Sequence, residues 1–591
     1  MSLLNKLNNA LATFIRVSSV LFFAIMLFVA SLQIVMRFIF KAPLAWTDEV
    51  AKYTFVWGTM LGCDYLVRTQ GHSKVSVLQT SLQKKCPAAA HGVKLFVDVI
   101  SEVFFAVVLI GGISLTCAGL STRTPALNFP VFIIYLIMPF SGLIMMLFQM
   151  EVLLKDLKKK RRDKLMVIGL LFLVLVAGLV LGAPIAVALG LGTFAASLAA
   201  ELPMGLVSQR MFVANASVSM MAVPFFMLAG SIMTAGGISK RLVRLSNALI
   251  GWVSGGLGLV ATLTACFFAA ISGSSSATAA AVGGALMPEM DKEGYDMEFS
   301  ACVVAAASTT GIVIPPSVSM VLYAVAASVS VGTMFLAGFI PGILMGLAVA
   351  VVLHHQAKKR NYPTSPKCSL KEISAAFLDS IWGLLTPVII IGGIYSGVFT
   401  ATEAAAASCV YAIFVSCVVY RELTLKQLPK IIFDAVLATA VVMFVMNAAG
   451  LFSWMITAYR VPELVTNFFT SITNNKYIML FLVNILLLVV GTFLNASSAV
   501  IILAPILVPL LTSMGIHPIL LGIVMIVNLA VGCITPPVGV SLFVVQSISS
   551  LPFEKICRGI IPYIVALLIV LLLITYVPVF SMGLPMLLHA I

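Results

Sequence analysis

Long apolar runs, separated by short charged or Pro/Gly-containing breaks, recur along the chain from Val17 to Phe580. Many of these runs approach the roughly 20 residues that an α-helix needs to cross a lipid bilayer. The pattern predicts about sixteen membrane elements when re-entrant segments are included. We therefore expect an all-α polytopic membrane protein.

Four of the apolar runs fall near the N-terminus, and they cover residues 17–40, 46–67, 93–117 and 130–154. An amphipathic stretch, residues 74–85, follows the second run and is expected to lie along the membrane interface. The sequence KDLKKKRRDK begins at residue 155 and is too highly charged to enter lipid. We therefore predict a four-helix domain at residues 1–154, a basic linker at residues 155–164 and a larger membrane domain at residues 165–591.

Composition excludes several classes of protein. Hydrophobic residues make up 61% of the chain and charged residues 9%, with a mean hydropathy of +1.14, so a water-soluble globule is excluded. The net charge of +14 includes short basic loops, which are typical of the cytoplasmic side of a membrane rather than of a nucleic-acid-binding surface. The P-loop pattern G-x-x-x-x-G-K-[ST] does not occur, so any energy source must be an ion gradient or a separate partner.

Three features of the larger domain recur at nearly the same interval. The double prolines beginning at Pro315 and Pro536 are 221 residues apart, and the small polar clusters around Ser274 and Ser497 are 223 apart. Apolar segments that end in glycine, FFMLAG and FVMNAAG, keep an interval of 220. These intervals predict an internal duplication, with copies at about residues 165–353 and 378–585. Loop charge does not establish whether the second copy is inverted.

The interrupted segments are the best candidates for a binding site. Proline has no N–H and its ring clashes with the carbonyl group one turn earlier, so each Pro-Pro pair should end a helix inside the membrane. Unpaired carbonyl groups are costly in hydrocarbon, and such a break persists only where it lines a cavity or binds an ion. The clusters SGSSSAT (residues 272–278) and NASSAV (residues 495–500) fit the tips of re-entrant hairpins. Hydroxyl and carbonyl oxygens suit hard cations, whereas half-helix N-termini favour a carboxylate.

Other candidate chemistry is weaker. Glu403 lies in an apolar segment, but its spacing from Thr400 fits a capping box at a helix N-terminus. An intramembrane serine protease would need a histidine in a span beside the Gly273–Ser276 cluster. The six histidines instead lie in loops, at span edges or near the C-terminus: His72, His91, His354, His355, His517 and His589. A channel is disfavoured because two interrupted binding segments suit occlusion better than a continuous pore, and we expect no enzyme activity.

Several motifs, in order, resemble one transporter family. The segments VPFFMLAGSIMTAGGISKRLV, SGSSSATAAAVGGALMPEM, GIVIPPS and GVFTATEAAA are similar to the large membrane subunit of tripartite ATP-independent periplasmic (TRAP) transporters. The first 154 residues, with four spans and WTDEVAKYTFVW, resemble the small membrane subunit of that family. The resemblance covers nearly the whole chain, in an arrangement that fuses the small and large subunits.

The resemblance implies a fold and a mechanism. It implies two inverted repeats with re-entrant hairpins, in a transport domain that moves as an elevator against a scaffold enlarged by the small subunit. It also implies that sodium ions drive the inward transport of an organic anion through the bacterial inner membrane. A soluble periplasmic substrate-binding protein delivers that anion to the permease. The runner-up interpretation is a stand-alone sodium-coupled carboxylate carrier, which has no evident need for the four-span N-terminal part.

The same resemblance assigns site residues. The first sodium site would involve a hairpin tip and the break that follows it: Ser274, Ser275, Ser276, Gly311, Val313 and Pro316. The second would involve their counterparts, Asn495, Ser497, Ser498, Gly532, Thr535 and Pro537. Ser272 and Ser317 are the candidates for the substrate carboxylate. Because Val538 stands where the repeat would place a counterpart of Ser317, we expect asymmetric binding on the first-half side. A sugar acid such as sialic acid is the leading substrate, with C4-dicarboxylates as the alternative.

Overall fold

The computed structural model describes residues 2–38, 40–42, 44–69, 87–156, 167–199, 204–216, 218–459, 473 and 475–590. Regular structure in these residues is helical, apart from one isolated β-bridge between Arg123 and Pro130. The predicted all-α class is confirmed. The amphipathic stretch at 74–85 and the basic linker from residue 157 onward lie outside the described residues.

The described helices are those of a multi-pass membrane protein. Ten are long and apolar enough to cross a membrane, and the number rises to thirteen if each of three bent helix pairs counts as one span. Shorter apolar helices of 10–17 residues accompany them at 170–181, 185–198, 256–272 and 518–532. Half-length helices of this kind are what the interrupted sequence segments predict.

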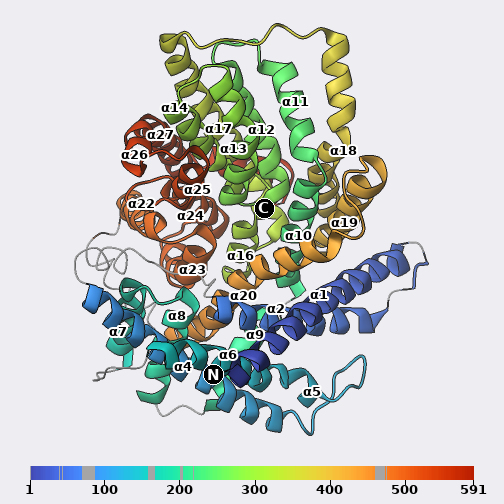
Figure 1. Ribbon diagram of the computed structural model, residues 1–591, viewed down its shortest axis with the longest axis vertical. Helices are drawn as coiled ribbons and strands as arrows, with labels where there is room; N and C mark the ends of the chain where they lie inside the picture. The colour runs from blue at the N-terminus through green and yellow to red at the C-terminus, as the bar shows by residue number, and fades with distance from the viewer. Residues whose placement is uncertain are drawn as a thin grey trace. The chain divides into compact units, whose positions relative to one another are not determined.

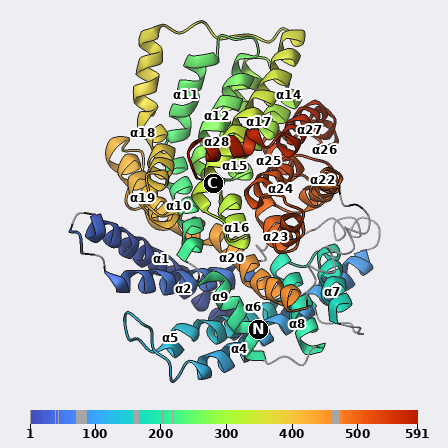
Figure 2. The ribbon, with the colours of Figure 1, turned by 180° about the vertical axis from the view of Figure 1, so that it is seen from behind.

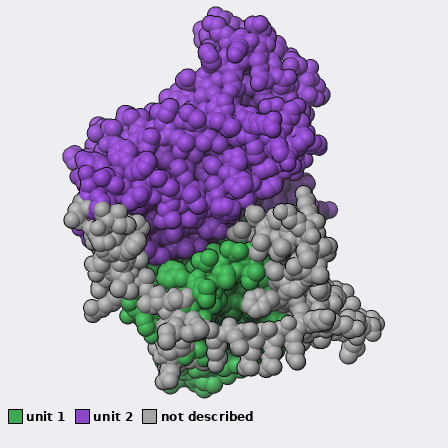
Figure 3. All heavy atoms as spheres, turned by 90° about the vertical axis from the view of Figure 1, so that its left-hand side faces the viewer, with its two compact units in different colours: residues 1–224, 432–462 green, residues 225–431, 463–591 purple. Residues whose placement is uncertain are grey.

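The chain forms two compact units, which Figure 3 colours separately. Unit 1 comprises residues 1–224 and 432–462, and unit 2 comprises residues 225–431 and 463–591. The four predicted N-terminal spans are present as helices, the fourth of them divided between α5 and α6. The helices of unit 1 are α1 (Ser2–Phe38), α2 (Ala45–Thr69), α4 (Pro87–Ala118), α5 (Val131–Tyr135), α6 (Ile137–Asp156), α7 (Val167–Leu181), α8 (Ile185–Ala199), α9 (Met204–Asn215), η1 (Val218–Met221) and most of α20 (Leu428–Ala458).

Helix α20 comes from far along the chain but packs among the N-terminal helices of unit 1. Gly62 on α2 faces Ala440, and a Cβ built on Gly62 would lie 2.8 Å from the Ala440 Cβ. The Cys63 thiol donates to the Ala440 carbonyl oxygen at 3.4 Å, and Asn447 contacts the Met60 sulfur at 3.3 Å. Small residues let membrane helices approach closely and gain van der Waals contact. The four-helix part and this segment of the larger domain therefore form one packed body.

Unit 2 holds both interrupted segments. Figures 1 and 2 show α12, α13 and α17 together in green, and α22 to α25 together in orange to red. Its helices in the first half are α10 (Ala222–Ala235, which begins in unit 1), α11 (Ile238–Ile250), α12 (Gly256–Ser272), α13 (Ser275–Lys292), α14 (Met297–Ser308), α15 (Thr310–Val313), α16 (Val318–Ala326) and α17 (Val331–Arg360). The second half contains α18 (Leu370–Tyr395), α19 (Ala401–Phe414), η2 (Val415–Val419), α22 (Lys476–Phe493), α23 (Ala496–Ser513), α24 (Pro518–Gly532), α25 (Val540–Ser549), α26 (Phe553–Gly559), α27 (Ile561–Tyr576) and α28 (Val579–Leu587).

Capping residues set the start of the two helices that open the second half. Ser369 and Glu372 form a capping box at the start of α18, and Thr400 and Glu403 form one at the start of α19. The Thr400 N–H donates to the Glu403 carboxylate at 2.8 Å, and the Glu403 N–H donates to the Thr400 hydroxyl at 3.3 Å. The capping interpretation of Glu403 is confirmed, so this membrane carboxylate serves a helix terminus.

The hydrophilic segment between the two copies is packed against the first half. Its early residues extend α17 to Arg360, and its coil begins at Asn361. Tyr362 stacks on Tyr295 with ring centroids 4.4 Å apart, and the Tyr295 hydroxyl donates to the Pro363 carbonyl at 2.7 Å. The Ser365 N–H donates to the Gly251 carbonyl at 3.0 Å. These contacts hold the connection on the helices of the first hairpin.

Candidate functional site

The first hairpin turns sharply between α12 and α13. Gly273 ends α12 in a left-handed conformation, with φ of 61° and ψ of 18°. Ser274 then caps α13, because its side chain accepts the Ala277 N–H at 3.4 Å. A positive φ favours glycine and serine is a preferred N-cap, so the sequence Gly-Ser ends one helix and starts the next. The predicted hairpin tip is therefore present at Gly273–Ser274.

The first break interrupts the helix that continues from α14 through α15. Residues 314–316 leave the helical conformation at the double proline, and the Pro315–Pro316 peptide bond is cis. Helix α16 restarts after Ser317, whose hydroxyl accepts the Met320 N–H at 3.4 Å. All residues from Gly311 to Ser317 are buried. The break lies inside the protein, where its carbonyl groups have no access to bulk water.

The first tip and the first break touch through their glycines. A Cβ built on Gly311 would lie 2.7 Å from the Ser274 carbonyl oxygen and 2.6 Å from the Thr278 hydroxyl. A Cβ built on Gly273 would lie 2.8 Å from the Pro316 carbonyl oxygen. Glycine is required at both positions because the two backbones approach this closely. The repeat motif therefore brings hairpin carbonyls and break carbonyls into one place.

This contact gathers neutral oxygens. The Thr278 hydroxyl donates to the Ser274 carbonyl at 2.8 Å and pairs with the Ser272 hydroxyl at 3.0 Å. Groups of three or more His, Cys, Asp or Glu that could hold a metal ion are absent from the described residues. Helix C-termini such as those of α12 and α15 carry partial negative charge, whereas the N-termini of α13 and α16 carry partial positive charge. The arrangement suits a hard cation beside the former and an anion beside the latter.

The serines of the first tip face in different directions. Ser274 and Ser276 pair their hydroxyls at 3.2 Å near the turn. Ser275 instead faces α14 and α25, where its hydroxyl lies 3.3 Å from that of Ser308 and 2.6 Å from that of Ser541. The Val313 carbonyl is directed at α17, since a Cβ built on Gly338 would lie 2.7 Å from its oxygen. The first sodium set thus contains residues that contact the tip and residues that contact other helices.

The two substrate candidates lie on either side of the first contact. The buried Ser317 hydroxyl donates to the Ile312 carbonyl at 2.5 Å and also caps α16. Ser272 is 8% exposed, and its hydroxyl pairs with the Thr278 hydroxyl. Both hydroxyls are therefore already engaged within the protein, and Ser317 in particular serves to restart a helix.

The second hairpin and the second break repeat this arrangement with different residues. Asn495 caps α23 by accepting the Ser498 N–H at 2.8 Å. Gly491 of α22 lies against Gly532 of α24, where a Cβ on Gly532 would be 2.6 Å from two Gly491 backbone atoms. The Gly539 N–H donates to the Thr492 carbonyl at 3.3 Å. The second contact is therefore formed by backbone against backbone.

The other predicted residues of the second set have local or distant partners. The Thr535 hydroxyl donates to the Val531 carbonyl within α24 at 2.8 Å. Ser497 pairs with Ser319 of the first half at 3.3 Å, and Ser498 is buried. Pro537 is exposed, and the Pro536–Pro537 peptide bond is cis. Asn495 thus lies at the second hairpin and Gly532 at the end of the helix before the second break, while Ser497 connects the two halves.

The comparisons with known proteins decide the family. The description "Tripartite ATP-independent periplasmic transporter, DctM component" matches residues 169–580, and "Tripartite ATP-independent periplasmic transporters, DctQ component" matches residues 26–159. The chain belongs to the TRAP transporter family. It carries the large and the small permease components in one polypeptide.

Named relatives of this TRAP permease have different substrates. The isethionate TRAP transporter permease protein DctMQ of Oleidesulfovibrio alaskensis is 36% identical, over 92% of this chain and 88% of that protein. The C4-dicarboxylate TRAP transporter large permease protein DctM of Pseudomonas aeruginosa is 42% identical, over 64% and 88% respectively. The sialic acid TRAP transporter large permease protein SiaM of Vibrio cholerae is 39% identical, over 64% and 88%. These relatives are named as permeases, and the chain is a multi-pass protein of the bacterial inner membrane.

Four polar residues of this TRAP permease's candidate site were missed by the sequence interpretation. Thr278 lies at the first tip-to-break contact, and Ser308, Ser319 and Ser541 pair with hairpin serines. Ser319 and Ser541 are 222 residues apart, and each is the second residue after an N-cap that follows a double proline. The interval of the duplication could have identified Ser319 and Ser541 as counterparts in the two copies.

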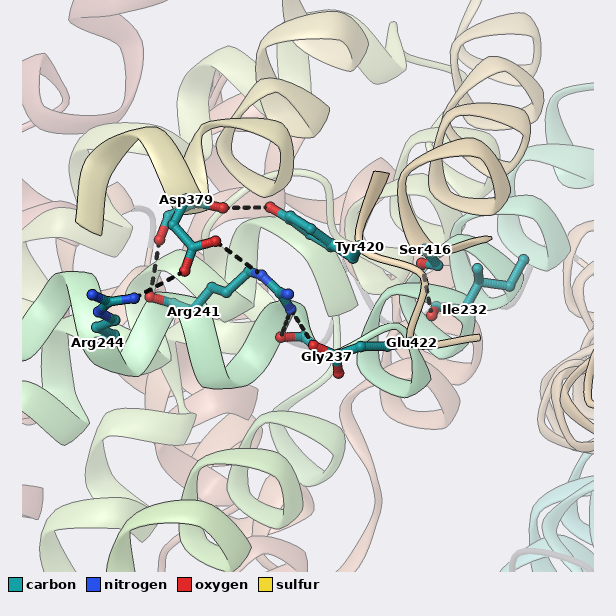
Figure 4. A network of polar contacts seen from close by, with 9 residues as sticks. Ile232, Gly237, Arg241, Arg244, Asp379, Ser416, Tyr420 and Glu422 are labelled. Atoms are coloured by element: carbon teal, nitrogen blue, oxygen red, sulfur yellow. Dashed lines mark hydrogen bonds and ion pairs between the residues drawn. The ribbon is translucent and has the colours of Figure 1, made fainter. Parts of the chain in front are cut away.

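A separate polar cluster of the TRAP permease lies on α11, α18 and the segment after η2. Figure 4 shows Arg241 between two carboxylates: its guanidinium bonds to Asp379 at 3.3 Å and to Glu422 at 2.6 Å. The same guanidinium lies 3.7 Å from the ring centroid of Tyr420, whose hydroxyl donates to the Asp379 carbonyl at 2.7 Å. A Cβ on Gly237 would overlap the Glu422 carboxylate. These contacts hold the turn between α10 and α11 against α18 and the segment after η2.

Proposed function

We propose that this TRAP permease couples the inward movement of a small organic anion to a sodium gradient. The observation that carries the proposal is the repeated contact between a hairpin tip and a broken helix, at Gly273 with Pro316 and at Gly491 with Gly532. The first contact gathers the uncharged oxygen atoms of Ser274, Thr278 and Pro316, and the second brings the Gly491 backbone, including its carbonyl oxygen, against Gly532. Uncharged oxygen atoms are the ligand chemistry of a hard monovalent or divalent cation. Two such contacts in one chain support two coupling ions.

The division into units supports an elevator mechanism. Both hairpins belong to unit 2, whereas the four N-terminal spans belong to unit 1 together with most of α20. In the proposed mechanism, unit 2 carries the anion and the ions, and unit 1 serves as the scaffold. A periplasmic substrate-binding protein delivers the anion, as the name of the family implies.

The proposed substrate is a small organic acid. The relatives named above carry isethionate, C4-dicarboxylates and sialic acid, which share an anionic acid group. The anion is proposed to lie beside the N-termini of half-helices, where the helix dipole and free N–H groups stabilise negative charge. A sugar acid such as sialic acid and a C4-dicarboxylate are both substrates to test, with isethionate as the sulfonate alternative.

Reconstituted transport tests this function. Proteoliposomes containing the purified permease are given each labelled anion with its cognate binding protein, with an imposed sodium gradient or with choline in place of sodium. Uptake of one anion is expected only when both the gradient and the binding protein are present. Equal uptake without sodium would remove the coupling proposal, and full uptake without the binding protein would favour the stand-alone carrier.

Two N-cap substitutions connect the function to the residues. Ser274→Ala and Asn495→Ala should each raise the sodium concentration for half-maximal uptake several-fold, up to about ten-fold for the loss of one oxygen ligand. Gly284→Ala is a matched control on α13, because a Cβ there would have no neighbour within 4 Å. Unchanged sodium dependence in both serine and asparagine variants would remove these residues from the ion sites.

A further inference from the structure

Two hydroxyl pairs connect the halves of unit 2. Ser275, the first residue of α13, pairs with Ser541 of α25 at 2.6 Å. Ser497 of α23 pairs with Ser319 of α16 at 3.3 Å. In each pair, one serine lies in the first turn of a hairpin helix and the other in the first turn of the helix that follows the opposite break. The two pairs thus form reciprocal connections.

The hydroxyl groups of the Ser275–Ser541 pair are shielded from water. Ser541 is fully buried and Ser275 is 5% exposed, so neither hydroxyl can exchange its partner for bulk water. Ser319 is 2% exposed at the reciprocal pair. A buried hydroxyl that loses its partner retains the cost of desolvation, so Ser541 and Ser319 favour the arrangement in which they remain paired. Ser497 is half-buried, and Ser275 also pairs with Ser308 at 3.3 Å.

Ser541 also helps to close the second break. Its backbone N–H donates to the Cys533 carbonyl at 3.0 Å, across the residues of the second double proline. One residue therefore holds the second break through its backbone and the first hairpin through its side chain. Ser275, in turn, is adjacent in the chain to the tip residue Ser274, whose carbonyl contacts Gly311.

We infer that the two serine pairs couple the two sodium sites. This inference rests on the proposed function, because it takes a sodium ion at each tip-to-break contact. An ion that orders the first tip fixes the first turn of α13 and, through Ser275 and Ser541, the start of α25 beside the second site. An ion at the second site acts in return through Ser497 and Ser319. Such coupling is reciprocal, so the first ion bound raises the affinity for the second.

Ser319 and Ser541 act in this scheme as positioning residues. Neither is required to touch an ion. The loss of either hydroxyl should therefore uncouple the two sodium sites without removing a site. The diagnostic readout is therefore the cooperativity of sodium binding, which a general loss of stability would not change.

Equilibrium binding of radiolabelled sodium tests the inference on the full-length permease in nanodiscs, at constant ionic strength with choline as the replacement cation. The unaltered protein should bind sodium with a Hill coefficient clearly above one. Ser541→Ala should lower the Hill coefficient towards one and raise the half-saturating sodium concentration by about five-fold or more, while two ions still bind at saturation. Ser319→Ala should act in the same direction, and Ser541→Thr, which keeps the hydroxyl, should restore cooperativity.

Ser547→Ala is the matched control, because this exposed serine of α25 bonds only to the Val544 carbonyl of its own helix. Its sodium binding should equal that of the unaltered protein. A cooperative Ser541→Ala variant, or an unaltered protein that binds two ions independently, would overturn the inference and leave the proposed function standing. Absence of sodium binding in the unaltered protein would instead overturn the proposed function. If Ser541→Ala does not fold, the same comparison is made with Ser319→Ala.

Discussion

The two interrupted segments of unit 2 share a motif but differ in their surroundings. The first break is buried throughout from Gly311 to Ser317, whereas Pro537 of the second break is exposed. The first tip-to-break contact includes the Thr278 hydroxyl, and the second brings Gly491 and Gly532 together through backbone atoms alone. A duplicated sequence pattern thus reproduces the interruption of the helix, while the residues around it decide its solvent exposure and chemistry.

The position after the double proline shows how this difference arises. Ser317 caps α16 through the Met320 N–H, but its counterpart by the interval of 221 is Val538, which has no oxygen to offer. Helix α25 has Gly539 at its N-cap instead, which provides no side-chain cap. The asymmetry that the sequence suggested for substrate binding is therefore, first of all, an asymmetry in how the two helices restart.

A buried amide chain is present in the second half and absent from the matching positions of the first. Asn528 of α24 donates to the Asn484 side chain at 2.6 Å, and Asn484 donates to Thr575 at 3.2 Å. The counterparts of the two asparagines at the interval of 221 are Ala307 and Leu263. The second half therefore joins α22, α24 and α27 by polar contacts one turn before the end of α24, whereas the corresponding residues of the first half are apolar.

The largest effect is expected where backbone faces backbone. Gly532→Ala should lower the free energy of unfolding by roughly 1–3 kcal/mol and abolish transport, because its Cβ would overlap Gly491 backbone atoms that no side-chain rotation can move. Gly311→Ala should cost somewhat less stability, since rotation of the Thr278 side chain can relieve one of its overlaps, but the overlap with the Ser274 backbone remains and should displace that carbonyl and weaken sodium dependence. Denaturant unfolding and sodium-dependent uptake measure the two effects.

Gly284→Ala, with open space around its Cβ, controls for the glycine-to-alanine change itself. It should be neutral or stabilising by up to about 1 kcal/mol, as alanine is the better helix former. Equal stability losses at Gly311 and Gly532 would erase the proposed distinction between the two contacts.

Much of this contrast could be predicted from the sequence, and a definite part could not. The double prolines, the serine-rich tip and the capping box at Glu403 are local signals, because each acts through its own backbone within a few residues. The direction of each serine in the run Ser274–Ser276 depends on the rotation of α13, which tertiary packing sets. One partner of Ser275, Ser541, lies 266 residues away, so no local pattern could identify it.

An intermediate effect is expected in the amide chain. Asn528→Leu removes the N–H group that donates to the Asn484 side-chain oxygen, and it should destabilise the protein by about 1–2 kcal/mol because a buried amide oxygen loses its partner. Asn484→Leu combined with Asn528→Leu should cost less than the sum of the single changes, since both partners are then apolar. Thermal or denaturant unfolding of the single and double variants measures the coupling. Strict additivity would mean that the amide contact contributes nothing to the second half.

The smallest effect is expected at the Arg241 cluster, which provides a reference away from both hairpins. Arg241→Lys keeps the charge but loses the planar guanidinium that bonds to two carboxylates and lies over Tyr420. The arginine side chain is 18% exposed and its partners Asp379 and Glu422 are 36% and 34% exposed, so solvent screening should limit the stability loss to about 1 kcal/mol or less. The half-saturating sodium concentration should not change, because the cluster contacts neither tip nor break. A sodium shift as large as that of Ser274→Ala would show that α11 and α18 take part in ion binding, and the contrast between the two halves would then have to include them.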